Sequence, residues 1–289
     1  MLCHGSWFNF TELGDKFYKE HNLTTMPIEM SKIKIEDEID NFYMIVNGKK
    51  DLELFEKIGI NNNINKIKLL SVGSCEASYY QTLKLSNDKK YDILFISQVV
   101  EQNFMDSKKY KFDKIFFDQT KIVLGFLSKY ALKKKLSVAY LCRLKTIFTN
   151  EEINFAKDIL SNGCDYKIIE NKNNPLWETI YSSKIITTVD STCGYDSIAV
   201  KKKTMLFPLF FSDKFIFATN PDRKLEKIWK WTVTDNDYRK FEALMDELFF
   251  LDQEKYEDQI KQSVNYLFDN TKNIPAHKFV YNFIKTNIA

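Results

Sequence analysis

The chain has 289 residues, and its 44% hydrophobic content is enough to fill the core of one large α/β domain or of two modest ones. Its 42 lysines and arginines nearly balance its 39 aspartates and glutamates, which excludes the overall basic field of a nucleic-acid-binding protein. The five cysteines are scattered singly, without the spacing of a metal site, so we expect reduced thiols in a cytoplasmic protein.

The first 65 residues differ from the rest of the chain. The opening segment, MLCHGSWFNF, lacks the regions of a signal peptide, and no apolar run approaches the roughly 18 residues of a membrane span. Further on, FYMIV predicts a strand and DLELFEKIGI predicts a helix. These elements are too few for a second complete nucleotide-binding domain, and the chain is expected to be soluble.

From about residue 66 onward, short β-rich runs alternate with longer helical patterns. This alternation predicts βαβ units and a doubly wound parallel sheet flanked by helices. Long helices are expected at 112–134 and at 150–163, the second with Asn150 as its cap and Gly163 as its stop. The predicted strands are KIKLLSVG (66–73), YDILFISQ (91–98), LSVAYLC (136–142), YKII (166–169), KIITTV (184–189) and TMLFPL (204–209).

The tail of the chain, from Asp235 onward, predicts three helices. Their apolar residues recur at helical spacing, so these helices are expected to pack on the sheet. Their sequences are DYRKFEALMDELFF, QEKYEDQIKQSVNYLFDN and PAHKFVYNFIKTN. The expected fold is therefore α/β, with a short amino-terminal region, a Rossmann-type parallel sheet and a helical carboxy-terminal tail.

A group of polar residues follows the predicted strand 184–189. In an open parallel sheet, ligands bind beyond the carboxyl ends of the strands, which is where Asp190, Ser191 and Thr192 stand. The small Gly194 would let a ligand or a neighbouring backbone approach, and the first turn of the following helix favours a phosphate. A simpler interpretation is that Ser191 or Thr192 caps this helix. The local sequence leaves the cap and the anion site equally open.

The order of elements around these residues is short helix, small polar pair, strand, polar group, short helix, basic turn and strand. It resembles the carboxy-terminal, donor-binding half of GT-B glycosyltransferases, especially those of bacterial capsule and lipopolysaccharide biosynthesis. Asp196 stands where that family has Glu, and Val200 and Lys201 replace an Arg-Gly pair. The matching residues are Ser183, Lys184, Thr188, Asp190, Ser191, Thr192, Gly194, Tyr195, Asp196, Ala199, Lys201, Lys202 and Lys203.

The resemblance implies further donor-binding residues at the ends of other predicted strands. Gly73 and Ser74 stand where the acceptor half of the family passes into the donor half, and a plain βα turn is the alternative. Gln98 ends the first full strand of the donor domain, where a surface loop explains it nearly as well. Arg143 follows strand 136–142, where its fork of donors could meet the donor phosphate or simply face solvent.

The dipeptide His4-Gly5 resembles an HG motif that lies late in the amino-terminal half of the family. The match implies His4 as a base or a phosphate contact, with a frayed terminal residue as the alternative. It also implies that residues 1–65 are the end of an acceptor-side domain, whereas residues 66–289 form the donor-binding domain. The chain would then be a fragment of a longer protein.

The resemblance implies a metal-independent glycosyltransferase without a cofactor. Its expected partners are a UDP- or CMP-linked sugar donor and a carbohydrate or lipid-linked acceptor, with no nucleic acid; peripheral association with a membrane is left open. The leaving phosphate would sit on the helix start at Ser191 and Thr192, helped by Arg143. The carboxylate of Asp196 would reach a ribose or sugar hydroxyl, or only the first turn of its own helix.

Two other functions remain open. A nucleotide-sugar epimerase or a polyol-phosphate transferase would use the same scaffold and the same phosphate-binding helix start. An epimerase needs several carboxylates around the sugar, and the first 65 residues offer no clear set. Alternatively, a chain with an incomplete acceptor half would only bind a nucleotide or a partner subunit, without catalysis.

Overall fold

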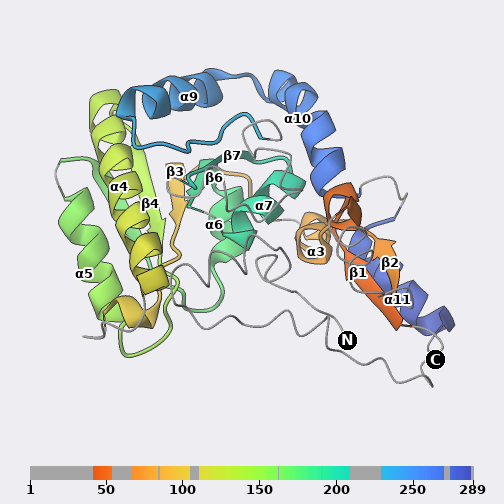
Figure 1. The fold of residues 1–289 in the computed structure, drawn as a ribbon. Helices are drawn as coiled ribbons and strands as arrows, with labels where there is room; N and C mark the ends of the chain where they lie inside the picture. Colours follow the sequence, from red (N-terminus) through yellow and green to blue (C-terminus); the bar gives the residue numbers. More distant parts are fainter. Residues whose placement is uncertain are drawn as a thin grey trace. The chain divides into compact units, whose positions relative to one another are not determined.

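A computed structural model describes residues 42–53, 67–83, 85–104, 111–161, 163–189, 191–208, 229–269 and 274–287 (Figure 1). The contacts divide the chain into two compact units. The first holds described residues of 1–82 and 260–289 together with Trp229, and the second holds those of 83–212 and 230–259. Within the described residues, no helix is both long enough and apolar enough to cross a membrane.

The second unit is built on a five-stranded, fully parallel sheet of order β5-β4-β3-β6-β7. Its three middle strands are almost entirely buried, because their β-branched and aromatic side chains are covered on both faces. The expected doubly wound α/β fold is therefore confirmed. The strands are β3 (Tyr91–Ile96), β4 (Ser137–Leu141), β5 (Asp165–Ile169), β6 (Ser183–Thr188) and β7 (Lys203–Leu206).

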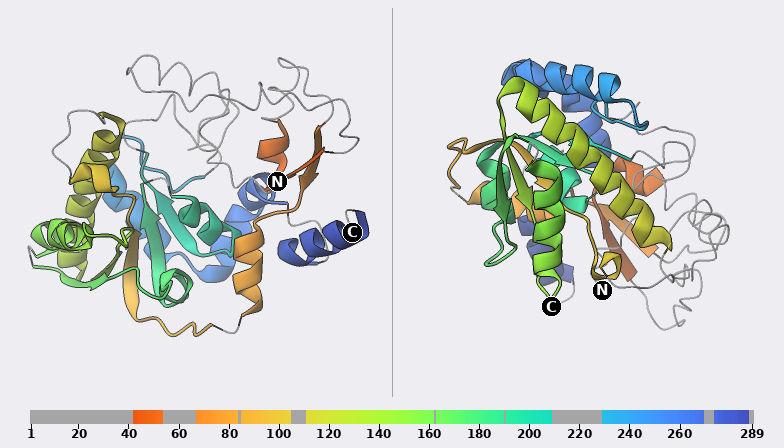
Figure 2. Two further views of the ribbon diagram at one scale, coloured as in Figure 1. Left: turned by 90° about the horizontal axis from the view of Figure 1, so that it is seen from below. Right: turned by 90° about the vertical axis from the view of Figure 1, so that its left-hand side faces the viewer.

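The strand order reverses beside β3. The chain runs outward from β3 through β4 to β5, returns to the other side of β3 at β6, and continues to β7. Two helices, α4 (Lys111–Lys134) and α5 (Thr149–Leu160), lie against β4 and β5, whereas α6 (Leu176–Tyr181) and α7 (Thr192–Ala199) lie against β6 and β7 (Figure 1, Figure 2). Right-handed crossovers put the two pairs on opposite faces. The boundary between β3 and β6 is thus the switch point of the sheet.

The expected helices of the second unit form, with one correction. Helix α5 begins at Thr149 with Phe148 as N-cap, so the predicted cap, Asn150, instead lies within the first turn. The helix ends at Leu160, and Gly163 has a φ of 111°, as expected of a glycine after a helix. Before these elements, the 3-10 turn η3 (Glu101–Asn103) follows the loop after β3.

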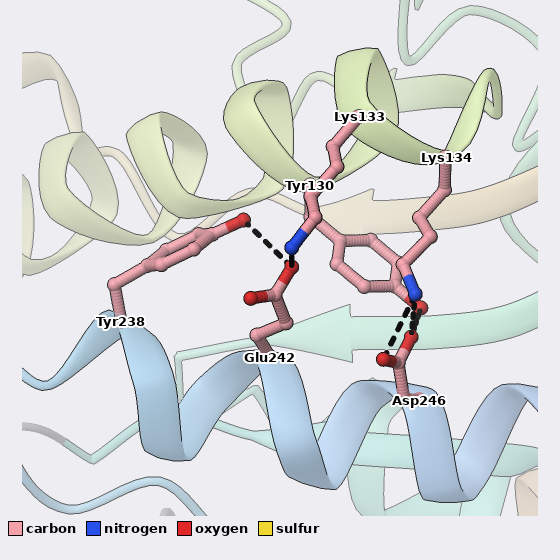
Figure 3. A network of polar contacts seen from close by, with 6 residues as sticks. All are labelled: Tyr130, Lys133, Lys134, Tyr238, Glu242 and Asp246. Carbon is pink, nitrogen blue, oxygen red and sulfur yellow. Dashed lines mark hydrogen bonds and ion pairs between the residues drawn. The ribbon is translucent and has the colours of Figure 1, made fainter.

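Helix α9 (Tyr238–Phe250) packs on α4, β6 and β7. Polar contacts join the two helices along one side of their interface (Figure 3). Asp246 receives hydrogen bonds from the Tyr130 hydroxyl at 2.7 Å and from Lys134, while Lys133 pairs with Glu242 at 2.7 Å. The first of the expected tail helices therefore covers the sheet together with α4.

The first unit holds a two-stranded parallel sheet of β1 (Phe42–Val46) and β2 (Ile67–Ser71). Helix α3 (Cys75–Thr82) packs against α11 (Ala276–Asn287), and the side chain of Ser78 hydrogen-bonds His277 at 2.9 Å. Helix α10 (Gln253–Leu267) starts in the second unit and ends in the first. The remaining predicted tail helices thus form as α10 and α11.

Candidate functional site

The candidate site is the carboxyl edge of the sheet in the second unit. Gln98 lies in the loop after β3, Arg143 in the loop after β4, and Ser191 in the loop after β6. Since β4 and β6 are the two neighbours of β3, the topology brings these loops to one edge around the switch point. Ligands of doubly wound folds bind at this place.

Ser191 is the N-cap of helix α7. Its backbone is extended, with φ −80° and ψ 141°, and its Oγ accepts a hydrogen bond from the amide of Cys193 at 3.3 Å. The amide of Gly194 already bonds the Ser191 carbonyl at 2.9 Å. Ser191 therefore accepts hydrogen bonds from two backbone amides of the first turn, those of Cys193 and Gly194. The exposed Thr192 is the first residue of the helix and lies at the positive end of the helix dipole. A cap and an anion site are compatible here.

Gly194 lets α7 lie directly on the sheet. A Cβ at this position would meet Thr188 Cγ2 at 2.5 Å and Leu206 Cδ2 at 3.3 Å. Thr188 cannot easily move away, because it is fully buried and its Oγ1 donates to the Ile96 carbonyl of β3 at 3.0 Å. The glycine therefore serves close packing between helix and strand, and the same threonine ties β6 to β3 at the switch point.

Arg143 spans from the loop after β4 to the loop after β3. Its Nη1 donates to the Gln98 carbonyl at 3.0 Å, and its side chain is exposed. Its own carbonyl accepts a hydrogen bond from the Asn171 side chain at 3.2 Å, which fastens the loop to the one after β5. A guanidinium has five N–H donors, so this one bond leaves most of them available to an oxyanion.

A buried carboxylate, Glu152, binds the backbone of the loop that carries Arg143. The sequence did not identify this residue. It lies in the first turn of α5 and is 0% exposed. Its Oε1 accepts the amide of Arg143 at 3.0 Å, and its Oε2 accepts the amide of Leu144 at 2.8 Å. The hydroxyl of Tyr140 lies 3.1 Å from Oε1 and 2.8 Å from Ser97 Oγ. One side chain thus fixes the backbone that carries the arginine.

The charge of Glu152 affects the groups around it. Burial, followed by the negative charge of Glu152, raises the pKa of Tyr140 far above its ordinary value, so this phenol stays protonated. Burial together with the charges of Glu152 and Glu170 raises the pKa of Cys142 to about 12. The cysteine beside the candidate site is therefore an unreactive thiol at neutral pH.

A family model described as "putative O-antigen biosynthesis protein" matches residues 30–286 of the chain. The chain belongs to this O-antigen biosynthesis family. This agrees with the resemblance of residues 174–208 to proteins of surface-carbohydrate biosynthesis. No curated protein matches the sequence significantly.

Several solved structures share the fold of this O-antigen family member. A "putative UDP-N-acetylglucosamine 2-epimerase" from Listeria monocytogenes is 9% identical, with a TM-score of 0.53 over 98% of this chain and 79% of that chain. The UDP-GlcNAc 2-epimerase of Methanocaldococcus jannaschii, solved with UDP-GlcNAc and UDP, is 13% identical, with a TM-score of 0.50 over 94% of this chain and 88% of that one. These two confirm the expected GT-B-like α/β fold.

The wall teichoic acid polymerase TagF is a third similar structure, at 18% identity and a TM-score of 0.49. The alignment covers 85% of this chain and 57% of the polymerase chain. The O-antigen family chain therefore spans less than two thirds of the length of that protein.

The other predicted residues of this O-antigen family member include two of the first unit, one on α7 and two outside the described residues. Gly73 and Ser74 belong to the first unit. Gly73 has a φ of 84°, which favours glycine, and Ser74 caps α3 by accepting the amide of Ala77 at 3.0 Å. Asp196 lies on α7 and is partly exposed. His4 and Asp190 lie outside the described residues, and their roles stay predictions.

Proposed function

We propose that this member of the O-antigen biosynthesis family is a glycosyltransferase that takes a sugar from a nucleotide-sugar donor in surface-polysaccharide assembly. The observation that carries the proposal is the arrangement of the carboxyl edge. The capped start of α7 and the guanidinium of Arg143 follow the two strands on either side of β3. A helix start and an arginine are two complementary donors for the oxygens of one phosphate group.

The proposed chemistry is loss of a phosphate leaving group. In the net reaction the acceptor oxygen becomes bonded to the anomeric carbon, the bond between that carbon and the donor's phosphate oxygen breaks, and the leaving group keeps the electron pair. The Thr192 end of α7 and the guanidinium of Arg143 would stabilise this developing charge, and Glu152 would hold the Arg143 backbone in place during the step. The acceptor hydroxyl must lose its proton, and His4 remains the proposed base.

A UDP- or CMP-linked sugar is the proposed donor, and a carbohydrate or lipid-linked hydroxyl is the proposed acceptor. We place the reaction in the cytoplasm, where nucleotide sugars are the expected substrates, and propose residues 66–289 as the donor-binding part.

Calorimetric titration of the purified chain with UDP, CDP and CMP tests donor binding. We expect one of the three to bind, and we expect Arg143→Ala to weaken that binding by about tenfold or more, as for a lost charge-assisted contact. Arg239→Ala is the matched control, because Arg239 is exposed at the start of α9 in the same unit. Absence of binding by all three nucleotides, or equal loss in both variants, would contradict the proposal.

Epimerisation is the second candidate, because two structures of the same fold are described as UDP-GlcNAc 2-epimerases. Incubation with a radiolabelled nucleotide sugar separates the two reactions. A transferase moves the labelled sugar to an acceptor. An epimerase needs no acceptor and inverts the configuration at one carbon of the labelled sugar. Nucleotide binding without either product would favour a non-catalytic binding module.

A further inference from the structure

Two lysines converge on one carbonyl at the amino edge of the sheet, opposite to the candidate site. Lys89 precedes β3 and Lys202 precedes β7. Lys89 Nζ donates to the Tyr181 carbonyl at 2.7 Å, and Lys202 Nζ donates to the same oxygen at 2.9 Å. The two nitrogens can therefore be no further apart than the sum of these two lengths.

Neighbouring lysines of this edge have other partners. Lys201 pairs with Glu257 at 2.8 Å, and Lys184 pairs with Asp92 at 2.7 Å. Lys203 donates to the carbonyls of Phe249 and Leu251. By contrast, within the described residues no carboxylate lies at ion-pair distance from Lys89 or Lys202. These two amines face each other without a compensating negative charge.

Lys202 is also the more enclosed member of the pair. Its side chain is partly buried, its Nζ lies 4.9 Å from the centroid of the Tyr181 ring, and the Asn87 Oδ1 is 3.4 Å away. Its backbone carbonyl accepts the hydroxyl of Tyr256, which fastens it to α10. The titratable groups that contact Lys202 are Lys89 from the loop before β3, Tyr181 on α6 and, through the backbone carbonyl of Lys202, Tyr256 on α10; Lys201 and Lys203 flank it along the chain.

Burial of Lys202 and the like charge of Lys89 both lower the pKa of Lys202. Burial, followed by the contact with Lys89, lowers the pKa of Lys202 to about 7. The charged form is the one that loses stability, so near neutral pH a large share of Lys202 carries an unprotonated amine. A lysine beside a second cation in a partly desolvated place is a known arrangement for a nucleophilic amine.

We propose that Lys202 is an acylation site, a nucleophilic amine that reacts with activated acyl donors of the acyl-phosphate class. The amine lone pair attacks the carbonyl carbon and forms an amide bond. The bond from that carbon to the phosphate oxygen breaks, phosphate leaves with the electron pair, and the amine proton passes to water. The amide product carries no charge, so acylation removes the repulsion between Lys89 and Lys202. The proposal does not depend on the glycosyltransferase assignment.

Acetyl phosphate is the probe that tests it. The folded chain is incubated at pH 7, digested with chymotrypsin, and acetylation of each lysine is measured by mass spectrometry with fragmentation. We expect Lys202 to be acetylated about tenfold or more faster than Lys201 and Lys184, since an ammonium held by a carboxylate has no lone pair available for attack. Lys201 and Lys184 are internal controls in the same sheet edge, and both are held in ion pairs.

Two variants test whether the charge of Lys89, and not solvent exposure of Lys202 alone, makes Lys202 reactive. Lys89→Met removes the neighbouring charge, so acetylation of Lys202 at pH 7 should slow severalfold, although burial keeps it above the controls. Lys89→Arg keeps a cation and should leave the rate within about twofold of the parent. Circular dichroism confirms that each variant is folded. Equal rates for Lys202 and Lys201 in the parent chain, or an unchanged rate in Lys89→Met, would overturn the proposal.

Discussion

The side-chain methyl of Thr188 packs so closely on Gly194 that a Cβ added to the glycine would lie only 2.5 Å from it. This close approach joins the last residue of β6 to the first turn of α7. Because Thr188 is also bonded to the Ile96 carbonyl of β3, the contact links three elements at the switch point of the sheet. The geometry of the candidate site therefore depends on a position without a side chain.

Gly194→Ala should destabilise the protein by about 1–3 kcal/mol, because the added methyl overpacks a buried contact that cannot relax freely. Chemical denaturation measures the free energy of unfolding. Gly125→Ala is the matched control, since nothing lies within 4 Å of a Cβ at this exposed position of α4. In a helix interior the same substitution should stabilise by about 1 kcal/mol.

The double variant Thr188→Ser/Gly194→Ala tests the cause of that loss. Serine keeps the hydroxyl that bonds Ile96 and removes the methyl that meets the new Cβ. The double variant should therefore recover most of the stability lost in Gly194→Ala. Strictly additive losses would show that some other contact of α7 is responsible.

Glu152→Gln should destabilise the protein by about 1–3 kcal/mol. The NH2 group of the new side chain replaces one carboxylate oxygen, so one of the two backbone N–H groups that Glu152 binds loses its acceptor. Amide hydrogen exchange gives a local readout, and the amides of Arg143 and Leu144 should exchange faster than in the parent chain. Glu151→Gln is the control, since Glu151 is the exposed neighbour in the same turn. Unchanged exchange at Arg143 and Leu144 would mean that Glu152 does not hold this loop.

The contact between α4 and α9 should depend on pH through Asp246. Burial alone would raise the pKa of Asp246, but hydrogen bonds from Lys134 and Tyr130 outweigh it and hold the pKa below the ordinary value of 3.8. A lowered pKa in the folded state gives stability that is present above the unfolded pKa and is lost as the pH falls through the folded pKa. Asp246→Asn should therefore lose stability at pH 7 and be less sensitive to acid below pH 4.

We expect a loss of at most about 1 kcal/mol at pH 7, because Asp246 is partly exposed and solvent screens the pair. Urea denaturation at pH 7 and pH 3 measures it. Glu242→Gln breaks the neighbouring ion pair with Lys133. Because Lys133 is more exposed than Lys134, this variant should lose less stability than Asp246→Asn. A difference between Asp246→Asn and the parent that is the same at both pH values would exclude the ionised carboxylate as the cause.

The framework of the fold could be predicted from the sequence because its signals are local. Short β-branched runs such as 184–189 and 136–142 alternate with helical periodicity; β4 forms within its range, and β6 begins and ends one residue before its own. The polar group after β6 also marks the switch-point edge, since strand ends of a parallel sheet share one edge. Arg143 and Gln98 reach the same edge for that reason.

The contacts that shape the edge could not be predicted in this way, because they join distant or backbone groups. Two of the partners of Glu152 are backbone amides, which no side-chain pattern records. The small size of Gly194 predicts the close approach of a ligand or of a neighbouring backbone, but the sequence does not show that Thr188, six residues earlier and on another element, is the residue packed against it. The pairing of Lys89 with Lys202 depends on the adjacency of loops before β3 and β7 to the end of α6.

Two substitutions of Ser191 separate its role as a cap from a role in ligand binding. Ser191→Ala removes the acceptor for the Cys193 amide and should cost about 1 kcal/mol of stability, whereas Ser191→Gly should cost only a few tenths. If the hydroxyl also contacts a phosphate, both variants lose nucleotide affinity to the same extent, because both lack it. If Ser191 acts only as a cap, affinity follows stability, and the glycine variant binds almost like the parent. Parallel measurements of unfolding and of calorimetric nucleotide binding distinguish the two, and a glycine variant that is stable but does not bind would assign the hydroxyl to the ligand.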